Sequence, residues 1–191
     1  MRASALLLVS LLAGCAGSPP SYTYIDRVRS GETLDRNLYT VAVPPVSVFS
    51  SYPGKDVQWE RDSRDDMPNA VVLKEGYPHS SYAATVEVNE KLRNVHNIEE
   101  LKTYVSSELK RANPIEAKRA QAQLLCVRPD VHIDQAADKP AFFMHTMHCI
   151  DKSSGRYYEL TVSLMTRRRD WFPARDLEAG AQHFFDSFKV K

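Results

Sequence analysis

Residues 144–149, with the sequence MHTMHC, gather side chains that could bind a soft metal ion such as copper. If this segment is a strand, the alternation of side chains puts His145 and His148 on opposite faces, where they cannot chelate one ion. His145, Met147 and Cys149 would share a face, but a disulfide at Cys149 would remove the thiolate. The spacing therefore favours ordinary core packing, and we predict no metal and no other cofactor.

Cys126 and Cys149 are predicted to face each other across a β-hairpin. They are equidistant from a turn centred at Ala137-Asp138. Directly opposed residues of antiparallel strands lie about 4.5 to 5.5 Å apart, which is close enough for a disulfide. An oxidising compartment would favour the bridge, and the alternative is a pair of buried free thiols.

The same register predicts the buried face of a three-strand meander, with a second turn centred at Ser153-Ser154. Its members are Cys126, Arg128, Asp130 and His132, then Phe143, His145, Met147 and Cys149, then Tyr158, Leu160, Val162 and Leu164. A slip of one residue would move a side chain to the other face.

This face would place Asp130 beside His145, either as a cross-strand hydrogen bond or, with a nearby serine, as a hydrolase-like acid–base pair. The sequence has no G-x-S-x-G, H-E-x-x-H, P-loop or C-x-x-C motif. We therefore do not expect an enzyme, and an enzyme that uses Asp130 and His145 is kept as the alternative.

The first fifteen residues have the organisation of a secretion signal. Arg2 is followed by an apolar run over residues 5–12, which is too short to span a bilayer, and the run closes with Leu12-Ala13-Gly14-Cys15. This tetrapeptide resembles the lipobox of bacterial lipoprotein precursors, in which the cysteine is diacylated and becomes the new N-terminus. An ordinary signal peptide with a chance cysteine is the alternative.

The expected organisation is a signal peptide over residues 1–14, a lipidated tether over 15–37 and one domain over 38–191. The chain has 25 basic and 24 acidic residues, so no net field favours nucleic acid. Attachment of the protein to the membrane would depend on the lipid at Cys15. Ala16, in place of an aspartate, resembles the signal for the outer membrane, so the predicted location is its periplasmic face.

The elements that would position these residues are typical of an α+β domain with an antiparallel sheet. Asn97 is a predicted N-cap with Glu100 in the capping-box position, and the helix that follows would end at Asn113-Pro114. A second helix is expected from 174 to 188. Strands are expected at 38–43, 56–60, 69–74, 82–88, 121–133, 141–150 and 156–166.

A basic and aromatic segment connects the last of these strands to the last helix. Its chemistry comes from Arg167, Arg168, Arg169, Trp171 and Phe172. Such side chains could contact anionic headgroups or an acidic protein partner, and the alternative is a solvated loop whose rings fold back onto the core.

Residues 98–188 resemble the PsbP/Mog-type α/β/α sandwich. The resemblance depends on the first helix, the meander with its apolar strand Tyr158 to Leu164, and the closing helix with the sequence FFDSFK. More narrowly, the chain looks like proteobacterial lipoproteins of that shape with one cysteine in each of two neighbouring strands, here Cys126 and Cys149. The resemblance implies a non-catalytic domain that binds an envelope protein partner or assists assembly. A purely structural envelope lipoprotein is a further alternative.

Overall fold

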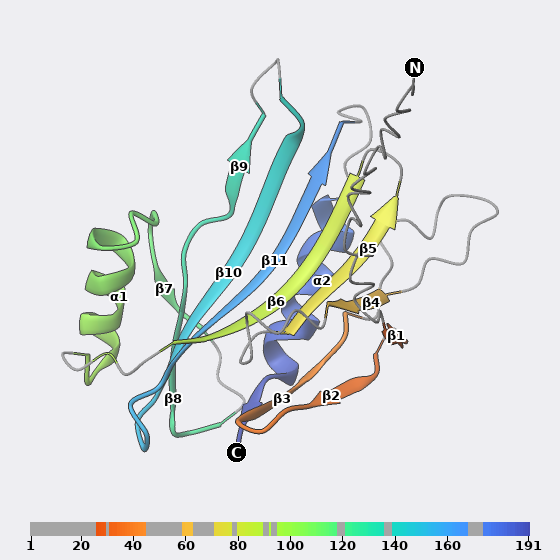
Figure 1. Ribbon diagram of the computed structural model, residues 1–191. Helices are drawn as coiled ribbons and strands as arrows, with labels where there is room; N and C mark the ends of the chain where they lie inside the picture. Colours follow the sequence, from red (N-terminus) through yellow and green to blue (C-terminus); the bar gives the residue numbers. More distant parts are fainter. Residues whose placement is uncertain are drawn as a thin grey trace, which may run out of the picture.

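The computed structural model describes residues 26–29, 31–44, 59–62, 71–77, 80–89, 92, 95–117, 121–135, 139–167 and 174–191. Within these ranges the chain forms a nine-stranded sheet, a three-stranded sheet and two α-helices (Figure 1). Every strand pairing is antiparallel. The predicted α+β class with an antiparallel sheet is confirmed at this level.

The elements follow one another along the chain with these bounds: β1 (Asp26–Val28), β2 (Thr33–Asp35), β3 (Tyr39–Ala42), β4 (Trp59–Asp62), β5 (Val71–Tyr77), β6 (Ser80–Asn89), α1 (Ile98–Ser107), β7 (Ile115–Glu116), β8 (Leu124–Arg128), β9 (His132–Asp134), β10 (Ala141–Asp151), β11 (Tyr157–Thr166), α2 (Ala174–Ser187) and β12 (Lys189–Val190).

The large sheet has the strand order β1-β4-β5-β6-β11-β10-β8-β7, and β9 pairs with β10 beyond the end of β8. The register of β10 with β11 places Cys149 opposite Tyr158, as the predicted turn at Ser153-Ser154 requires. The predicted core face is also confirmed along these two strands. Its buried members there are Phe143, His145, Met147, Cys149, Tyr158, Leu160, Val162 and Leu164.

The two helices cover opposite faces of the large sheet (Figure 1). Along β11, Tyr158 belongs to the core under α2, whereas its neighbour Tyr157 belongs to the smaller core under α1. Successive side chains of a strand point to opposite faces, so these two tyrosines separate the two cores. β10 is accordingly buried on both faces over its last residues, from His145 to Asp151.

The core under α2 also includes the three-stranded sheet, whose order is β12-β3-β2. Phe188, at the end of α2, lies between the two sheets, with its ring centroid 5.7 Å from that of Tyr39 and 5.2 Å from that of Tyr158. The contact with Tyr158 is edge-to-face and the contact with Tyr39 is tilted, and aromatic pairs of this kind stabilise beyond the apolar area that they bury. The short sheet is thereby held against the large one through the end of the helix.

Helix α1 begins where the sequence predicts. The side chain of Asn97 accepts a hydrogen bond from the backbone N–H of Glu100 at 2.9 Å, and the Glu100 carboxylate accepts one from the N–H of His96 at 2.6 Å. The helix ends earlier than expected, because Lys110 adopts a positive φ of 55° and the Arg111 N–H donates to the Val105 carbonyl at 3.1 Å. A residue in the left-handed region just past the last turn is a common way for a helix to end.

Residues 15–37 were predicted to form a tether. The part of this segment that the structure describes belongs instead to the folded domain. β1 pairs with β4, and β2 pairs with β3. Val28 and Leu34 are buried in the main core, so the apolar area that they bury offsets the entropy of ordering this segment. The domain therefore begins no later than Asp26, not at Leu38.

Candidate functional site

The two cysteines of the domain form a buried disulfide. Cys126 in β8 lies directly opposite Cys149 in β10, and their Cα atoms are 4.2 Å apart. Both residues are at most 1% exposed. The predicted pairing of the two cysteines is confirmed. The predicted hairpin register holds between β8 and β10 but is off by one residue between β9 and β10, next to the turn. The bridge leaves neither thiolate for metal binding.

The two histidines of β10 lie on opposite faces, as predicted, with His145 on the α2 side and His148 on the α1 side. Within the described ranges, no group of three or more His, Cys, Asp or Glu side chains is arranged to hold a metal ion. Helices long and apolar enough to cross a membrane are likewise not found there.

The predicted pairing of Asp130 with His145 is wrong, because the register changes between β8 and β9. Cys149 pairs with Cys126, whereas Met144 pairs with His132, so the strand from β8 to β9 contains one extra residue. Pro129 lies in this bulge, where a residue without a backbone N–H is tolerated. One extra residue reverses the faces beyond it, and His132 therefore lies on the α1 face with Met144, not on the predicted core face.

Asp130 has different partners. Its carboxylate accepts a hydrogen bond from the Asn113 side chain at 2.6 Å, and its backbone N–H donates to the Ala112 carbonyl at 2.9 Å. His145 is buried, and within the described residues its Nδ1 has no hydrogen-bond partner. Burial, reinforced by the charge of Arg128, lowers the pKa of His145 and favours a neutral ring. The acid–base pair considered for an enzyme is not assembled.

Arg128, which was predicted on the core face, contacts two residues of α2 and so links this helix to the large sheet. Its Nη1 donates to Gln182 Oε1 at 2.5 Å, and its guanidinium carbon lies 5.0 Å from the centre of the Phe185 ring. Burial lowers the pKa of Arg128, while Glu178 and Asp186 act in the opposite direction. The planar guanidinium suits both a hydrogen bond and a ring contact, which a lysine would not combine.

A row of titratable side chains crosses three strands on the α1 face. Glu87 in β6 is paired with Glu159 in β11, and Glu159 is paired with His148 in β10. The side chain of His148 is fully buried, and that of Glu159 is 24% exposed. Burial raises the pKa of Glu159, and the opposing carboxylate of Glu87 raises it further. Sequence analysis did not identify this row, because Glu87 is far from the other two in the chain.

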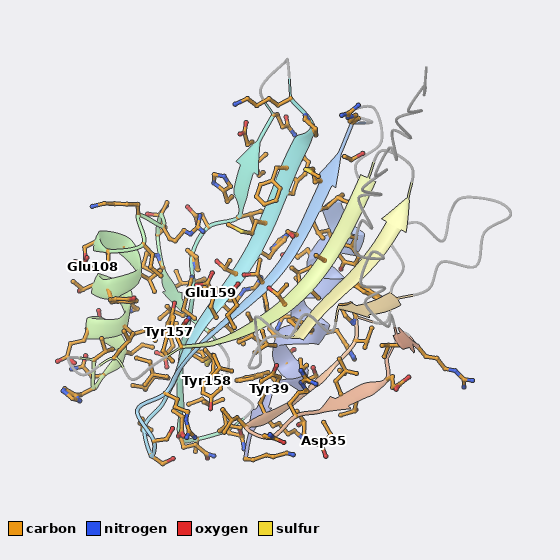
Figure 2. The ribbon with its side chains drawn as sticks, in the orientation of Figure 1. Asp35, Tyr39, Glu108, Tyr157, Tyr158 and Glu159 are labelled. Atoms are coloured by element: carbon orange, nitrogen blue, oxygen red, sulfur yellow. A yellow bond between two sulfur atoms is a disulfide. The ribbon has the colours of Figure 1, made fainter. Side chains whose placement is uncertain are left out.

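His148 is held by aromatic neighbours. Its Nδ1 lies 2.6 Å from the Tyr157 hydroxyl, and the two rings are stacked with centroids 6.0 Å apart. Tyr104 of α1 packs edge-on against Tyr157 at 5.8 Å, and Figure 2 places Tyr157 beside α1. Burial, with a contribution from the charge of Arg111, lowers the pKa of His148 to about 4. The imidazole is therefore neutral at neutral pH.

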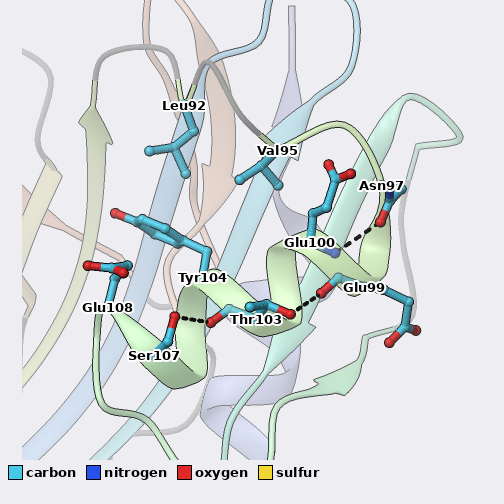
Figure 3. A pocket seen from close by; sticks show the side chains of 9 residues that line it. All are labelled: Leu92, Val95, Asn97, Glu99, Glu100, Thr103, Tyr104, Ser107 and Glu108. Carbon is cyan, nitrogen blue, oxygen red and sulfur yellow. Dashed lines mark hydrogen bonds between the residues drawn. The ribbon is translucent and has the colours of Figure 1, made fainter.

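A groove opens beside α1 (Figure 3). It has a volume of about 720 Å³, and Tyr104 links it to the buried Tyr157. Figure 3 shows Leu92 and Val95 on the far side of the groove from the helix. The residues that line it are Leu92, Val95, Asn97, Glu99, Glu100, Thr103, Tyr104, Ser107 and Glu108. An apolar wall with a few polar groups beside it is the usual lining of a ligand-binding site.

The other predicted site residues lie mostly outside the described residues. Arg167 follows β11 and is exposed. Arg168, Arg169, Trp171 and Phe172 are outside the described ranges, as is Cys15. The lipidation and partner-surface predictions therefore stay predictions.

Comparison with known proteins adds no assignment, since no protein-family model matches the chain and no curated protein matches it.

Removing the disulfide should destabilise the domain. Cys126→Ala/Cys149→Ala should lower the free energy of unfolding by about 3 kcal/mol, because the bridge closes a loop with a sequence separation of 23. Urea titration of both proteins measures this difference. Non-reduced peptide mapping should recover the 126–149 peptide pair, and alkylation of both thiols in denaturant without reductant would contradict the bridge.

Acidification should destabilise the protein through His148. The folded-state pKa of about 4 lies below the unfolded value of 6.5, so the unfolded chain takes up this proton first as pH falls. The stabilisation that neutral His148 provides is fully present above pH 6.5. It is lost as the pH falls to about 4, and the total loss is at most about 3 kcal/mol. His148→Gln should remove this part of the pH dependence in denaturant titrations, whereas His183→Gln, at an exposed position of α2, should not. Parallel stability curves for wild type and His148→Gln would refute this assignment.

Proposed function

We propose that this chain is a lipoprotein of the bacterial outer membrane, anchored through Cys15 on the periplasmic face. Its domain would serve the cell envelope as a non-catalytic binding or assembly module. The observation that carries this proposal is the groove beside α1, which combines an apolar wall with exposed carboxylates and is lined by Tyr104, whose ring packs edge-on against the buried Tyr157. Preformed grooves of this kind bind a partner with little ordering cost.

The envelope location is supported by two independent features. The first is the lipobox-like Leu12-Ala13-Gly14-Cys15 at the end of the signal-like segment. The second is the buried Cys126–Cys149 disulfide, since disulfides persist in oxidising compartments such as the periplasm. Both features are expected of a protein that is exported to the periplasm and anchored there by lipid.

The proposal extends to the finer description of the fold as a PsbP/Mog-type α/β/α sandwich. What supports it is the placement of α1 and α2 on opposite faces of one antiparallel sheet. A non-catalytic role is consistent with Asp130, which accepts a hydrogen bond from Asn113 and does not pair with His145.

The groove favours a partner of particular chemistry. Glu108 is exposed at its rim, and Glu99 is exposed but paired with Lys102 at 2.8 Å. Leu92 and Val95 offer apolar contacts. In a peptide segment with a small apolar side chain next to a lysine or arginine, the apolar side chain would contact the apolar wall and the basic side chain would pair with the carboxylates. The basic segment that begins at Arg167 is proposed as a separate part of the partner surface, for anionic headgroups or an acidic protein.

Lipid attachment predicts a simple outcome for Cys15→Ala. The variant should lose labelling by a fatty-acid probe and should leave the membrane fraction or stall as the unprocessed precursor. Ser18→Ala, a nearby change that spares the cysteine, should behave as wild type. Retained fatty-acid labelling in Cys15→Ala would exclude this anchor.

The partner surfaces can be located by site-specific crosslinking in intact envelopes. A photoactivatable side chain at Glu108 or Arg167 should capture a discrete partner, and the same group at Lys152, exposed in the turn between β10 and β11, should not. Glu108→Gln should weaken capture through the groove, and Arg167→Ser/Arg168→Ser/Arg169→Ser should make capture at the basic segment less salt-sensitive. Identical products from positions 108, 152 and 167 would contradict both surfaces.

A further inference from the structure

The Cys126–Cys149 bridge crosses the large sheet where the pairing between neighbouring strands is short. β8 pairs with β10 over residues 124–127 and 148–151, whereas β11 is paired along its whole length with both β10 and β6. The other neighbour of β8 is β7, which has two residues. A covalent bond therefore lies at a junction that few backbone hydrogen bonds hold.

The bridge also fixes the surface on which α1 docks. Cys126 belongs to the core under α2, whereas its two neighbours in β8, Leu125 and Val127, belong to the smaller core under α1. Leu101 and Val105 of the helix are buried in that same core. Because alternation links the two faces of β8, holding Cys126 against β10 also holds Leu125 and Val127 under the helix.

We propose that the disulfide is a redox latch that locks the unit formed by α1, β7 and β8 onto the large sheet. In the oxidised chain this α1–β7–β8 unit stays docked, and the groove beside α1 is complete. In the reduced chain β8 can separate from β10 while β6, β11 and β10 stay paired, and the groove then loses the wall that carries Tyr104. The inference rests on the proposed function only for the use of the groove by a partner.

The latch closes by exchange between the two thiols and a disulfide oxidant. One thiolate attacks the disulfide of the oxidant, and the second attacks the mixed disulfide. The cysteines give up two electrons and two protons, and the oxidant leaves as two thiols. Both cysteines are at most 1% exposed in the folded chain, so an oxidant or a reductant reaches them only when β8 opens. The latch is therefore set during folding in an oxidising compartment, and a chain in a reducing compartment would lack it.

Hydrogen exchange of the full chain in detergent tests the latch without any partner. In the oxidised wild type, the backbone amides of β8 should exchange only through global unfolding, as those of β11 do. In Cys126→Ala/Cys149→Val, which fills the core without the bridge, the amides of β8 should exchange at least about tenfold faster than those of β11. Wild type refolded in reductant should show the same divergence, and reoxidation with glutathione disulfide should remove it.

Val162→Ala is the matched control. Val162 is fully buried in the core under α2 and is paired with His145, away from the bridged part of β10. This change should weaken the whole domain and accelerate exchange in β8 and β11 by the same factor. The latch would be overturned if the bridge-free variant behaved in the same way, or if β8 already exchanged faster than β11 in the oxidised wild type.

Photocrosslinking from position 108 separates the latch from the proposed function. The bridge-free variant should lose the partner that the wild type captures there, whereas Val162→Ala should keep it. Equal capture by the wild type and the bridge-free variant would contradict control of the groove by the latch. A wild type that captures no partner at position 108 would instead contradict the proposed use of the groove, and the exchange rates of β8 and β11 would still decide whether the latch exists.

Discussion

The alternation of side chains along β10 and β11 is the constraint on which the rest of the structure depends. Over the last residues of β10 both faces are buried, so every position must suit one of two cores. Odd-numbered residues such as Met147 and Cys149 face α2, and even-numbered residues such as His148 and Ile150 face α1. The disulfide holds this register where β8 joins β10, and a slip of one residue would exchange the two cores.

This constraint also explains the unusual electrostatics under α1. Pairing of β6, β11 and β10 puts Glu87, Glu159 and His148 in one row, with like charges directly opposed. The sheet tolerates the row because burial keeps His148 neutral and raises the pKa of Glu159, while the Tyr157 hydroxyl lies against the imidazole. Perturbed titratable groups often cluster at functional sites, and here the cluster lies under Tyr104, which lines the groove.

Short elements produce the surfaces that remain available for partners. α1 ends at Ser107 and covers only the part of its face where Leu101 and Val105 dock, which leaves a groove along its side. The bulge at Pro129 separates β8 from β9 and leaves β9 as a short edge strand with exposed side chains. The groove and the exposed side chains of β9 are therefore consequences of where regular structure stops.

The sequence by itself determined the features that depend on local spacing. These are the start of α1 at Asn97, the turn between β10 and β11 and the core face along those strands. The opposition of Cys126 to Cys149 was also predicted, but it depends on the extra residue between β8 and β9, because the register next to the turn before β10 differs by one from the predicted register. Turn chemistry, capping and alternation act over a few residues, so each can be deduced without knowing the fold. Only the tertiary structure decided the rest. The bulge that moved His132 to the other face, the inclusion of β1 and β2 in the domain and the row from Glu87 to His148 all arise from pairings between distant segments. Such pairings are selected by the apolar area that they bury together, which no local pattern encodes.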